Sequence, residues 1–132
     1  MIHLVTGGSG SGKSAYAEQC ILDFGGTRRV YIATMQPFGA EGQARIARHR
    51  KMRAAKKFST IECYTNLKEV ELEPGSDVLL ECMSNLTANE IFDPSGAGKA
   101  RTEEEILAGV SRLANQARNL VLVTNEIFSD GY

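Results

Sequence analysis

The stretch Ile2-His3-Leu4-Val5-Thr6-Gly7-Gly8-Ser9-Gly10-Ser11-Gly12-Lys13-Ser14 decides the fold of this chain. Its last eight residues satisfy the phosphate-loop pattern GxxxxGK[ST], and the apolar run before them predicts a buried strand. In this motif the glycines let successive backbone N–H groups turn towards a polyphosphate, and the following helix points its positive end at it. Lys13 is placed to reach the terminal phosphates, and Ser14 to ligate magnesium. We therefore predict a nucleotide phosphate site formed by Gly7, Gly8, Ser9, Gly10, Ser11, Gly12, Lys13 and Ser14.

The composition is that of one globular domain. The 132 residues are 42% hydrophobic and 23% charged, with a net charge of −1, which is ordinary for a chain that buries a core. No apolar run approaches the ~20 residues of a membrane span, and Ile2 to Val5 is too short for the hydrophobic region of a signal peptide. Three cysteines without a CxxC pair are typical of reduced thiols in the cytoplasm. We expect residues 1–132 to form a single cytoplasmic nucleotide-binding domain without a membrane span.

Strand and helix patterns alternate along the rest of the chain. The sequence predicts strands at Ile2–Thr6, Arg29–Thr34, Phe58–Cys63, Asp77–Glu81 and Leu120–Thr124. It predicts helices at Lys13–Phe24, Glu41–Lys57 and Ser84–Phe92, and another that begins with a capping box of Thr102 and Glu105. Apolar strands that alternate with helices indicate a parallel sheet covered on both faces. The expected fold class is therefore α/β, a mostly parallel sheet of the P-loop NTPase (RecA-like) type.

A second candidate site residue is Glu81, which ends the predicted strand Asp77–Glu81. In phosphate-loop proteins a carboxylate at such a strand end holds magnesium, directly or through water. The alternative is a charged residue that only ends the strand. Because the phosphate loop precedes it, the magnesium interpretation is favoured, and Ser14 and Glu81 are the candidate metal ligands.

A basic segment is the next informative feature. Positions 45 to 57 hold seven cations and no acid: Arg45, Arg48, Arg50, Lys51, Arg53, Lys56 and Lys57. In a helix, Arg45, His49 and Arg53 form one stripe. Neighbouring cations disfavour imidazolium, which leaves His49 a lone pair for attack on phosphorus, while Arg45 and Arg53 can neutralise phosphate charge in the transition state. A solvated helix face and a nucleic-acid-binding patch remain open as alternatives from these residues alone.

Five segments in order together resemble one enzyme family. They are LVTGGxxSGKS at Leu4 to Ser14, YIAT at Tyr31 to Thr34, RIxxHxxxR at Arg45 to Arg53, LLEC at Leu79 to Cys82 with Asn89 beyond it, and VLVTNE at Val121 to Glu126. In this respect the chain is similar to the bifunctional adenosylcobinamide kinase / adenosylcobinamide-phosphate guanylyltransferase family of cobalamin biosynthesis. The combination covers almost the whole chain and is far more specific than the phosphate loop alone.

The resemblance implies two transfers on a corrinoid. The family phosphorylates the aminopropanol hydroxyl of adenosylcobinamide with a nucleoside triphosphate, ATP or GTP, and then transfers GMP from GTP through a guanylylated histidine, which corresponds to His49. Family nucleotide contacts fall on the phosphate loop and on Ala33, Thr34, Met35, Arg50, Lys51, Met52, Arg53, Glu62 and Glu81. We expect Mg²⁺ as cofactor, nucleotides and adenosylcobinamide as partners, no nucleic acid, and a homo-oligomer, a trimer by resemblance.

The chain also departs from the family pattern. Many members have arginine where this chain has Gly10 and proline where it has Ala54, and they continue past the VLVTNE segment with a helix and a final strand. We therefore expect Ile2–Thr6 to lie beside Leu120–Thr124 with its other edge open, and Tyr132 to be a truncation point.

Two alternatives differ in function. One is a simpler P-loop kinase or nucleotide-binding protein in which His49 is not catalytic. The other is a nucleic-acid-dependent ATPase, which the absence of aromatic residues within the basic segment disfavours.

Overall fold

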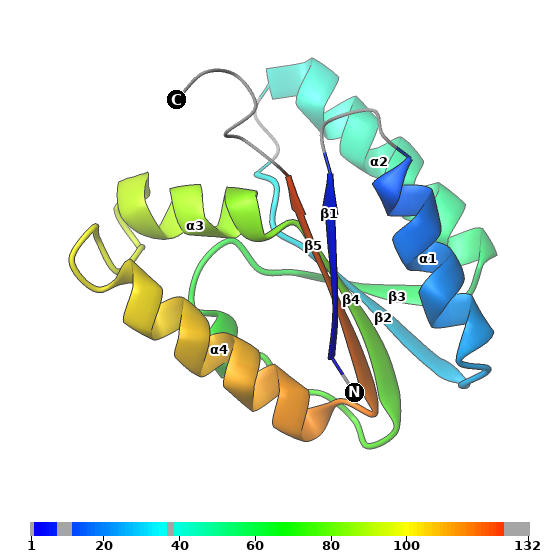
Figure 1. Cartoon of the computed structure of the whole chain (residues 1–132). Coiled ribbons are helices and arrows are strands. Elements are labelled where there is room, and N and C mark those ends of the chain that lie inside the picture. Colours follow the sequence, from blue (N-terminus) through cyan, green and yellow to red (C-terminus); the bar gives the residue numbers. More distant parts are fainter. Residues whose placement is uncertain (1, 8–11, 37–38, 126–132) are drawn as a thin grey trace.

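The computed structural model describes residues 2–7, 12–36 and 39–125. Strands and helices alternate along the chain, as the sequence predicts (Figure 1). The strands are β1 (Ile2–Gly7), β2 (Arg28–Ala33), β3 (Phe58–Glu62), β4 (Ser76–Glu81) and β5 (Asn119–Asn125). The helices are α1 (Lys13–Asp23), α2 (Gly39–Ala55), α3 (Met83–Phe92) and α4 (Thr102–Gln116), with a short 3₁₀ helix, η1 (Leu67–Glu69), between β3 and β4.

The five strands form one sheet in the order β1-β5-β4-β2-β3. All four neighbouring pairs are parallel, which confirms the expected parallel sheet and the pairing of the first strand with the last. Because the strands are parallel, the carboxyl ends of all five lie along one edge of the sheet (Figure 1). Ligands of open α/β proteins bind in the crevice outside this edge.

Helices cover both faces of the sheet, with α1 and α2 on one side and α3 and α4 on the other (Figure 1). The two faces carry separate hydrophobic clusters because successive strand residues point to opposite sides. Beneath α1 and α2, Ala17 and Ile21 pack with Tyr31, Leu79 and Val121. The opposite cluster joins the sheet to α3 and α4 and consists of Ile32, Cys63, Leu67, Val78, Leu80, Leu86, Ile106, Leu113, Leu120 and Leu122.

Several predicted helix ends differ from the structure, and for two of them the local reason is visible. The residue before α4 is Arg101 rather than Thr102, and the Thr102 hydroxyl donates to the Gly98 carbonyl at 2.7 Å instead of capping the helix. Helix α2 ends at Ala55, two residues before the predicted end, because Lys57 has a left-handed φ of 63°. Such a backbone conformation cannot continue a right-handed helix.

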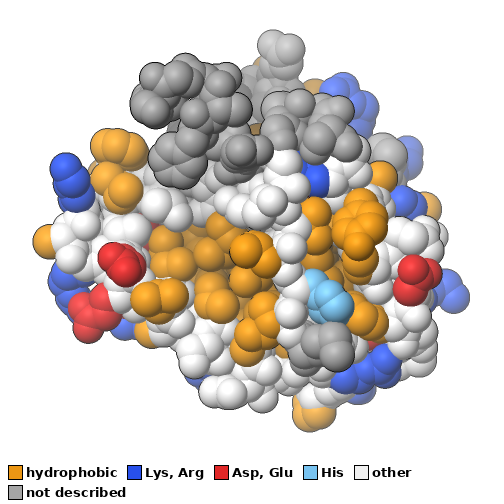
Figure 2. All heavy atoms as spheres, viewed as in Figure 1, with side chains coloured by type: hydrophobic (Ala, Val, Ile, Leu, Met, Phe, Trp, Pro, Cys, Tyr) orange, Lys and Arg blue, Asp and Glu red, His pale blue; other side chains and the backbone are white. Residues whose placement is uncertain are grey.

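The outer strand β1 pairs with β5 and, among the described residues, with no other strand. One side of β1 is covered, and the His3 ring lies 5.5 Å from the ring of Phe24. On its other side Ile2 and Leu4 are 54% and 64% exposed. Figure 2 shows hydrophobic side chains gathered on this face of the molecule. The place of β1 at the end of the strand order confirms, within the described residues, the open edge expected for the first strand.

No helix in the described ranges combines the length and the apolar character needed to cross a membrane.

Candidate active site

The start of α1 lies where a phosphate loop requires it. Residues 8–11 of the predicted loop lie outside the described residues. The residues on either side are described: Gly7 ends β1, and Gly12 precedes α1 with a left-handed φ of 79°, a conformation that favours glycine. Lys13 and Ser14 are the first two residues of α1. The strand and the helix that frame a phosphate loop are therefore both in place.

The structure brings the two candidate metal ligands together. The Ser14 hydroxyl, at the start of α1, donates to Glu81 Oε2, at the end of β4, at 2.5 Å. The other carboxylate oxygen, Glu81 Oε1, is buried and has no hydrogen-bond partner among the described residues. An unpartnered buried oxygen beside a hydroxyl oxygen suits Mg²⁺, which prefers oxygen ligands and commonly takes only one or two from the protein. These residues therefore fit the expected ion, and Ser14 and Glu81 would hold it.

We expect Glu81→Gln to raise the Mg²⁺ concentration needed for half-maximal nucleotide binding by about tenfold or more. Even the outer partners of a bound metal cost about 10- to 100-fold in metal affinity when they are replaced. A magnesium titration of GTP binding measures the shift. Glu104→Gln, at an exposed position of α4, is the control. If Glu81→Gln keeps the wild-type magnesium dependence, Glu81 is only the end of a strand.

Arg53 occupies a position that the sequence did not predict. Its side chain is only 6% exposed, and its guanidinium carbon lies 3.6 Å from the centre of the Tyr31 ring. Arg53 Nε is buried without a hydrogen-bond partner in the described part of the chain. The spacing predicts Arg53 as a phosphate contact, and the structure adds that its guanidinium stacks on the Tyr31 ring of β2. Sequence reasoning gave Tyr31 no role, because the YIAT segment alone reads as core.

The pKa of the Tyr31 hydroxyl depends on its burial and on Glu81, the carboxylate that accepts from Ser14. Burial raises the pKa of Tyr31 well above its usual range, and the nearby Glu81 charge raises this pKa further. The phenol therefore stays protonated at physiological pH. A cavity of about 250 Å³ joins these groups and is lined by Ser14, Ala15, Glu18, Tyr31, Arg53, Lys56 and Glu81. One cavity thus holds both candidate metal ligands and one of the two arginines predicted to stabilise phosphate charge.

We expect Tyr31→Leu to lower the free energy of unfolding by about 1–3 kcal/mol, because it removes the ring on which the buried Arg53 stacks. Tyr31→Phe keeps the ring and should cost less than about 1 kcal/mol. Urea unfolding of both variants measures the difference. Equal losses in the two variants would show that the hydroxyl, and not the stacking, carries the effect.

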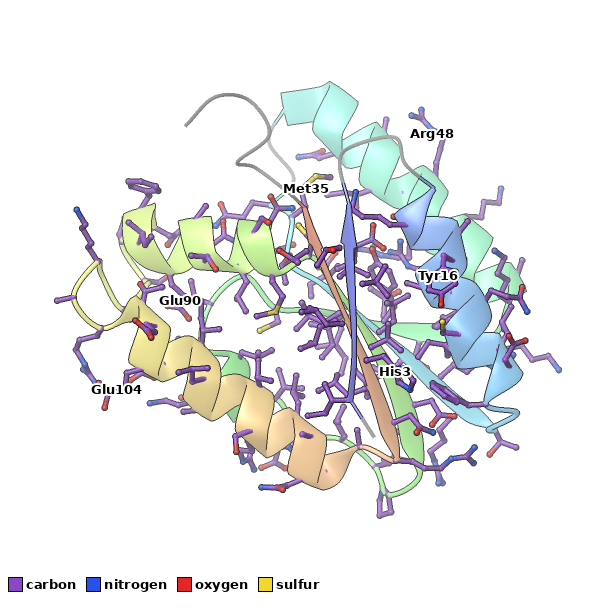
Figure 3. All side chains as sticks on the ribbon, viewed as in Figure 1. His3, Tyr16, Met35, Arg48, Glu90 and Glu104 are labelled. Carbon is purple, nitrogen blue, oxygen red and sulfur yellow. The ribbon has the colours of Figure 1, made fainter. Side chains whose placement is uncertain are left out.

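The segment after β2 is held by hydrogen bonds within the protein. The fully buried Thr34 hydroxyl donates to the carbonyl of Cys82 and accepts from its N–H, both at 2.8 Å. The Thr34 carbonyl accepts from Asn89 Nδ2 at 2.8 Å. Ala33, which ends β2, and the half-buried Met35 flank it at the carboxyl edge of the sheet (Figure 3). Thr34 therefore anchors the predicted nucleotide-binding segment Ala33-Thr34-Met35 to the backbone of Cys82, directly after β4.

Helix α2 carries the remaining predicted residues. Arg50 forms an ion pair with Glu62 at the end of β3, so two predicted nucleotide contacts meet each other. Lys51 is exposed. Positions 45, 49 and 53 lie four residues apart along α2 and so share one helix face. The side chains of Arg45, His49 and Met52 lie outside what the structure describes.

Strand β1, the start of α1 and the Ser14–Glu81 contact at the edge of a parallel sheet define an α/β protein with the P-loop NTPase-like fold. The chain belongs, more specifically, to the cobinamide kinase / cobinamide phosphate guanyltransferase family, whose model matches residues 3–131. Two relatives are each called bifunctional adenosylcobalamin biosynthesis protein CobU, one from Escherichia coli (strain K12) and one from Salmonella typhimurium (strain LT2). Each is 35% identical over 140 residues, which cover 96% of this chain and 76% of the relative. The resemblance inferred from the sequence is confirmed.

Proposed function

We propose that this protein phosphorylates adenosylcobinamide and then transfers GMP from GTP to the phosphorylated product, in the assembly of the nucleotide loop of cobalamin. Membership of the family over residues 3–131 supports the proposal. The observation that carries it is the contact between Ser14 and Glu81 beside the unpartnered Glu81 oxygen, because both transfers need a held triphosphate.

The first transfer is a phosphorylation. The aminopropanol hydroxyl of the corrinoid attacks the γ-phosphorus of ATP or GTP and releases its proton to solvent. The bond from this phosphorus to the bridging oxygen breaks as the nucleoside diphosphate leaves. Lys13 and the N–H groups at the start of α1 bind the terminal phosphates. Bound Mg²⁺, held by Ser14 and Glu81, would offset the negative charge of the phosphates.

The second transfer, of GMP, proceeds through a covalent intermediate on the protein. A His49 nitrogen attacks the α-phosphorus of GTP, and pyrophosphate leaves. A phosphate oxygen of the phosphorylated corrinoid then attacks the same phosphorus, which frees His49 and leaves GMP joined to the corrinoid phosphate. Arg45 and Arg53 stabilise the charge that builds on the phosphoryl oxygens. Stacking on Tyr31 keeps the Arg53 guanidinium in the cavity that Glu81 also lines.

GTP labelled at the α-phosphorus tests this proposal. The protein should carry the label after denaturation, the bond should be labile to acid as expected for a phosphoramidate, and adenosylcobinamide phosphate should discharge it. Phosphorylation of cobinamide without any protein label would favour the simpler kinase in which His49 has no catalytic role. Neither transfer with either nucleotide would overturn the proposal altogether.

The cysteines and the family resemblance bear on the compartment and the oligomeric state of the protein. Cys20, Cys63 and Cys82 take part in no disulfide. Burial raises the pKa of the Cys63 thiol to about 11, so this thiol stays protonated. Such buried, unreactive thiols suit the reducing cytoplasm. We propose a cytoplasmic homo-oligomer, a trimer as the resemblance implies, and sedimentation analysis tests the oligomeric state.

A further inference from the structure

A second cavity opens over the ends of β2 and β3. Its volume is about 510 Å³, and it shares no lining residue with the cavity of Ser14, Arg53 and Glu81. We call it the amide pocket, because the amide side chains of Gln36 and Asn66 line it. Its polar lining residues are Gln36, Glu62, Tyr64, Thr65, Asn66, Glu69, Asp93 and Ser95.

A buried carboxylate braces one wall of the amide pocket. Glu90 of α3 is 2% exposed and lies between α3 and α4 (Figure 3). Its Oε2 accepts a hydrogen bond from the backbone N–H of Asn66, and its Oε1 accepts from that of Ala97, both at 2.9 Å. Glu90 thus ties the turn after β3 to the loop before α4, so the pocket is formed before any ligand binds.

Asp93 fixes another wall. Its Oδ2 accepts from Gln36 Nε2 at 2.9 Å, and its Oδ1 accepts from the Ser95 hydroxyl at 2.6 Å and the Ser95 N–H at 2.9 Å. The Ser95 and Gln36 hydrogen bonds lower the pKa of Asp93. The pocket therefore presents a carboxylate, with neutral hydrogen-bonding groups beside it.

The charge of the amide pocket favours a neutral or cationic ligand over a nucleoside triphosphate. Of the described residues that line it, Glu62, Glu69 and Asp93 carry carboxylates and none is a cation. Glu62 forms an ion pair with Arg50, so the negative charge of the pocket comes from Glu69 and Asp93. The first cavity, in contrast, contains the cations Arg53 and Lys56 beside the carboxylates Glu18 and Glu81. A triphosphate would be repelled from a surface of one negative sign. The amide pocket suits a ligand that is neutral or positive and rich in N–H donors.

We propose that the amide pocket binds the rim of the corrinoid, an inference that rests on the proposed function. A cobinamide is a cationic macrocycle fringed with neutral primary carboxamides. Each carboxamide offers two N–H donors and a carbonyl acceptor. Glu69 and Asp93 accept from the donors, and the Asn66 amide and Thr65 hydroxyl donate to the carbonyls.

The position of the amide pocket allows the two substrates to meet. Strand β2 pairs with β4, whose end carries Glu81, and with β3, whose end borders the pocket. Neighbouring strands lie about 4.8 Å apart, so one or two spacings, roughly 5–10 Å, separate these strand ends. A macrocycle held in the pocket can extend its aminopropanol arm along the carboxyl edge towards the nucleotide phosphates.

Charge changes in the amide pocket test the proposal. We expect Glu69→Lys combined with Asp93→Asn to weaken cobinamide binding at least tenfold in equilibrium dialysis, read from the absorbance of the corrin. GTP affinity, measured in parallel, should change less than twofold. Glu104→Lys makes the same charge reversal on exposed α4, outside the pocket (Figure 3), and should leave both affinities unchanged.

Hydrogen exchange supplies a second measurement that needs no substitution. Bound cobinamide should slow amide exchange in the peptides that cover residues 62–69 and 93–97. Unchanged cobinamide affinity in the double variant, an equal loss of GTP affinity, or protection only outside these peptides would each overturn the pocket assignment. A wild-type protein that binds no cobinamide would overturn the proposed function as well. Wild-type binding that the double variant retains would leave that function standing and remove only the amide pocket.

Discussion

Replacement of His49 by alanine should abolish covalent guanylylation while GTP affinity changes less than about threefold. No other group on the Arg45–Arg53 face of α2 can form the phosphoramidate, because a guanidinium stays protonated and is not nucleophilic. Labelling with GTP that carries the isotope at its α-phosphorus, followed by denaturing electrophoresis, measures the loss. Undiminished labelling would remove His49 from the mechanism.

His3→Ala is the matched control for this experiment. His3 lies on β1 with its ring against Phe24, and its Nε2 is buried. It lies near the start of β1, on the α1 side of the sheet, away from the carboxyl edge at which we expect the phosphates to bind. Labelling of the His3 variant should therefore equal that of the wild type.

Lys13→Ala should weaken GTP binding and slow both transfers by about 100-fold or more, because it removes the cation that the phosphate-loop motif assigns to the terminal phosphates. Isothermal titration with GTP and separate assays of the two transfers measure these effects. Lys99→Ala is the control, since Lys99 is exposed in the loop between α3 and α4 and follows a glycine, as Lys13 does. Full GTP affinity in the Lys13 variant would contradict a phosphate-loop role.

The alternation of strands and helices could be predicted from the sequence because each element has its own local signal. The apolar strands around Val78 and Val121 and the helix formers of α2 are recognisable without tertiary information. Helix ends depend on single contacts instead. The Glu105 N–H, which a Thr102 cap would need as its donor, already donates to the Arg101 carbonyl at 3.0 Å, and no sequence pattern reveals that pairing.

The candidate site could be predicted only in part, for a related reason. The motif and a strand end identified Ser14 and Glu81, and the fold brings the two into contact. The stacking of Arg53 on Tyr31 joins residues 22 positions apart, and a basic run gives no sign that one of its members is buried. Glu90 is equally hidden, because a single acid in a short helix reads as a solvent-exposed residue until the turn at Asn66 packs against it.

The strand order has a consequence for how the chain folds during synthesis. Strand β1 is made before the other described elements, yet its partner β5 is made more than a hundred residues later. At about 5–20 residues per second, a ribosome leaves β1 unpaired for several seconds. Contacts between such distant segments are slow to form. The residues that flank the phosphate loop should therefore be ordered last, so that GTP binding by nascent chains begins only once β5 has left the ribosome.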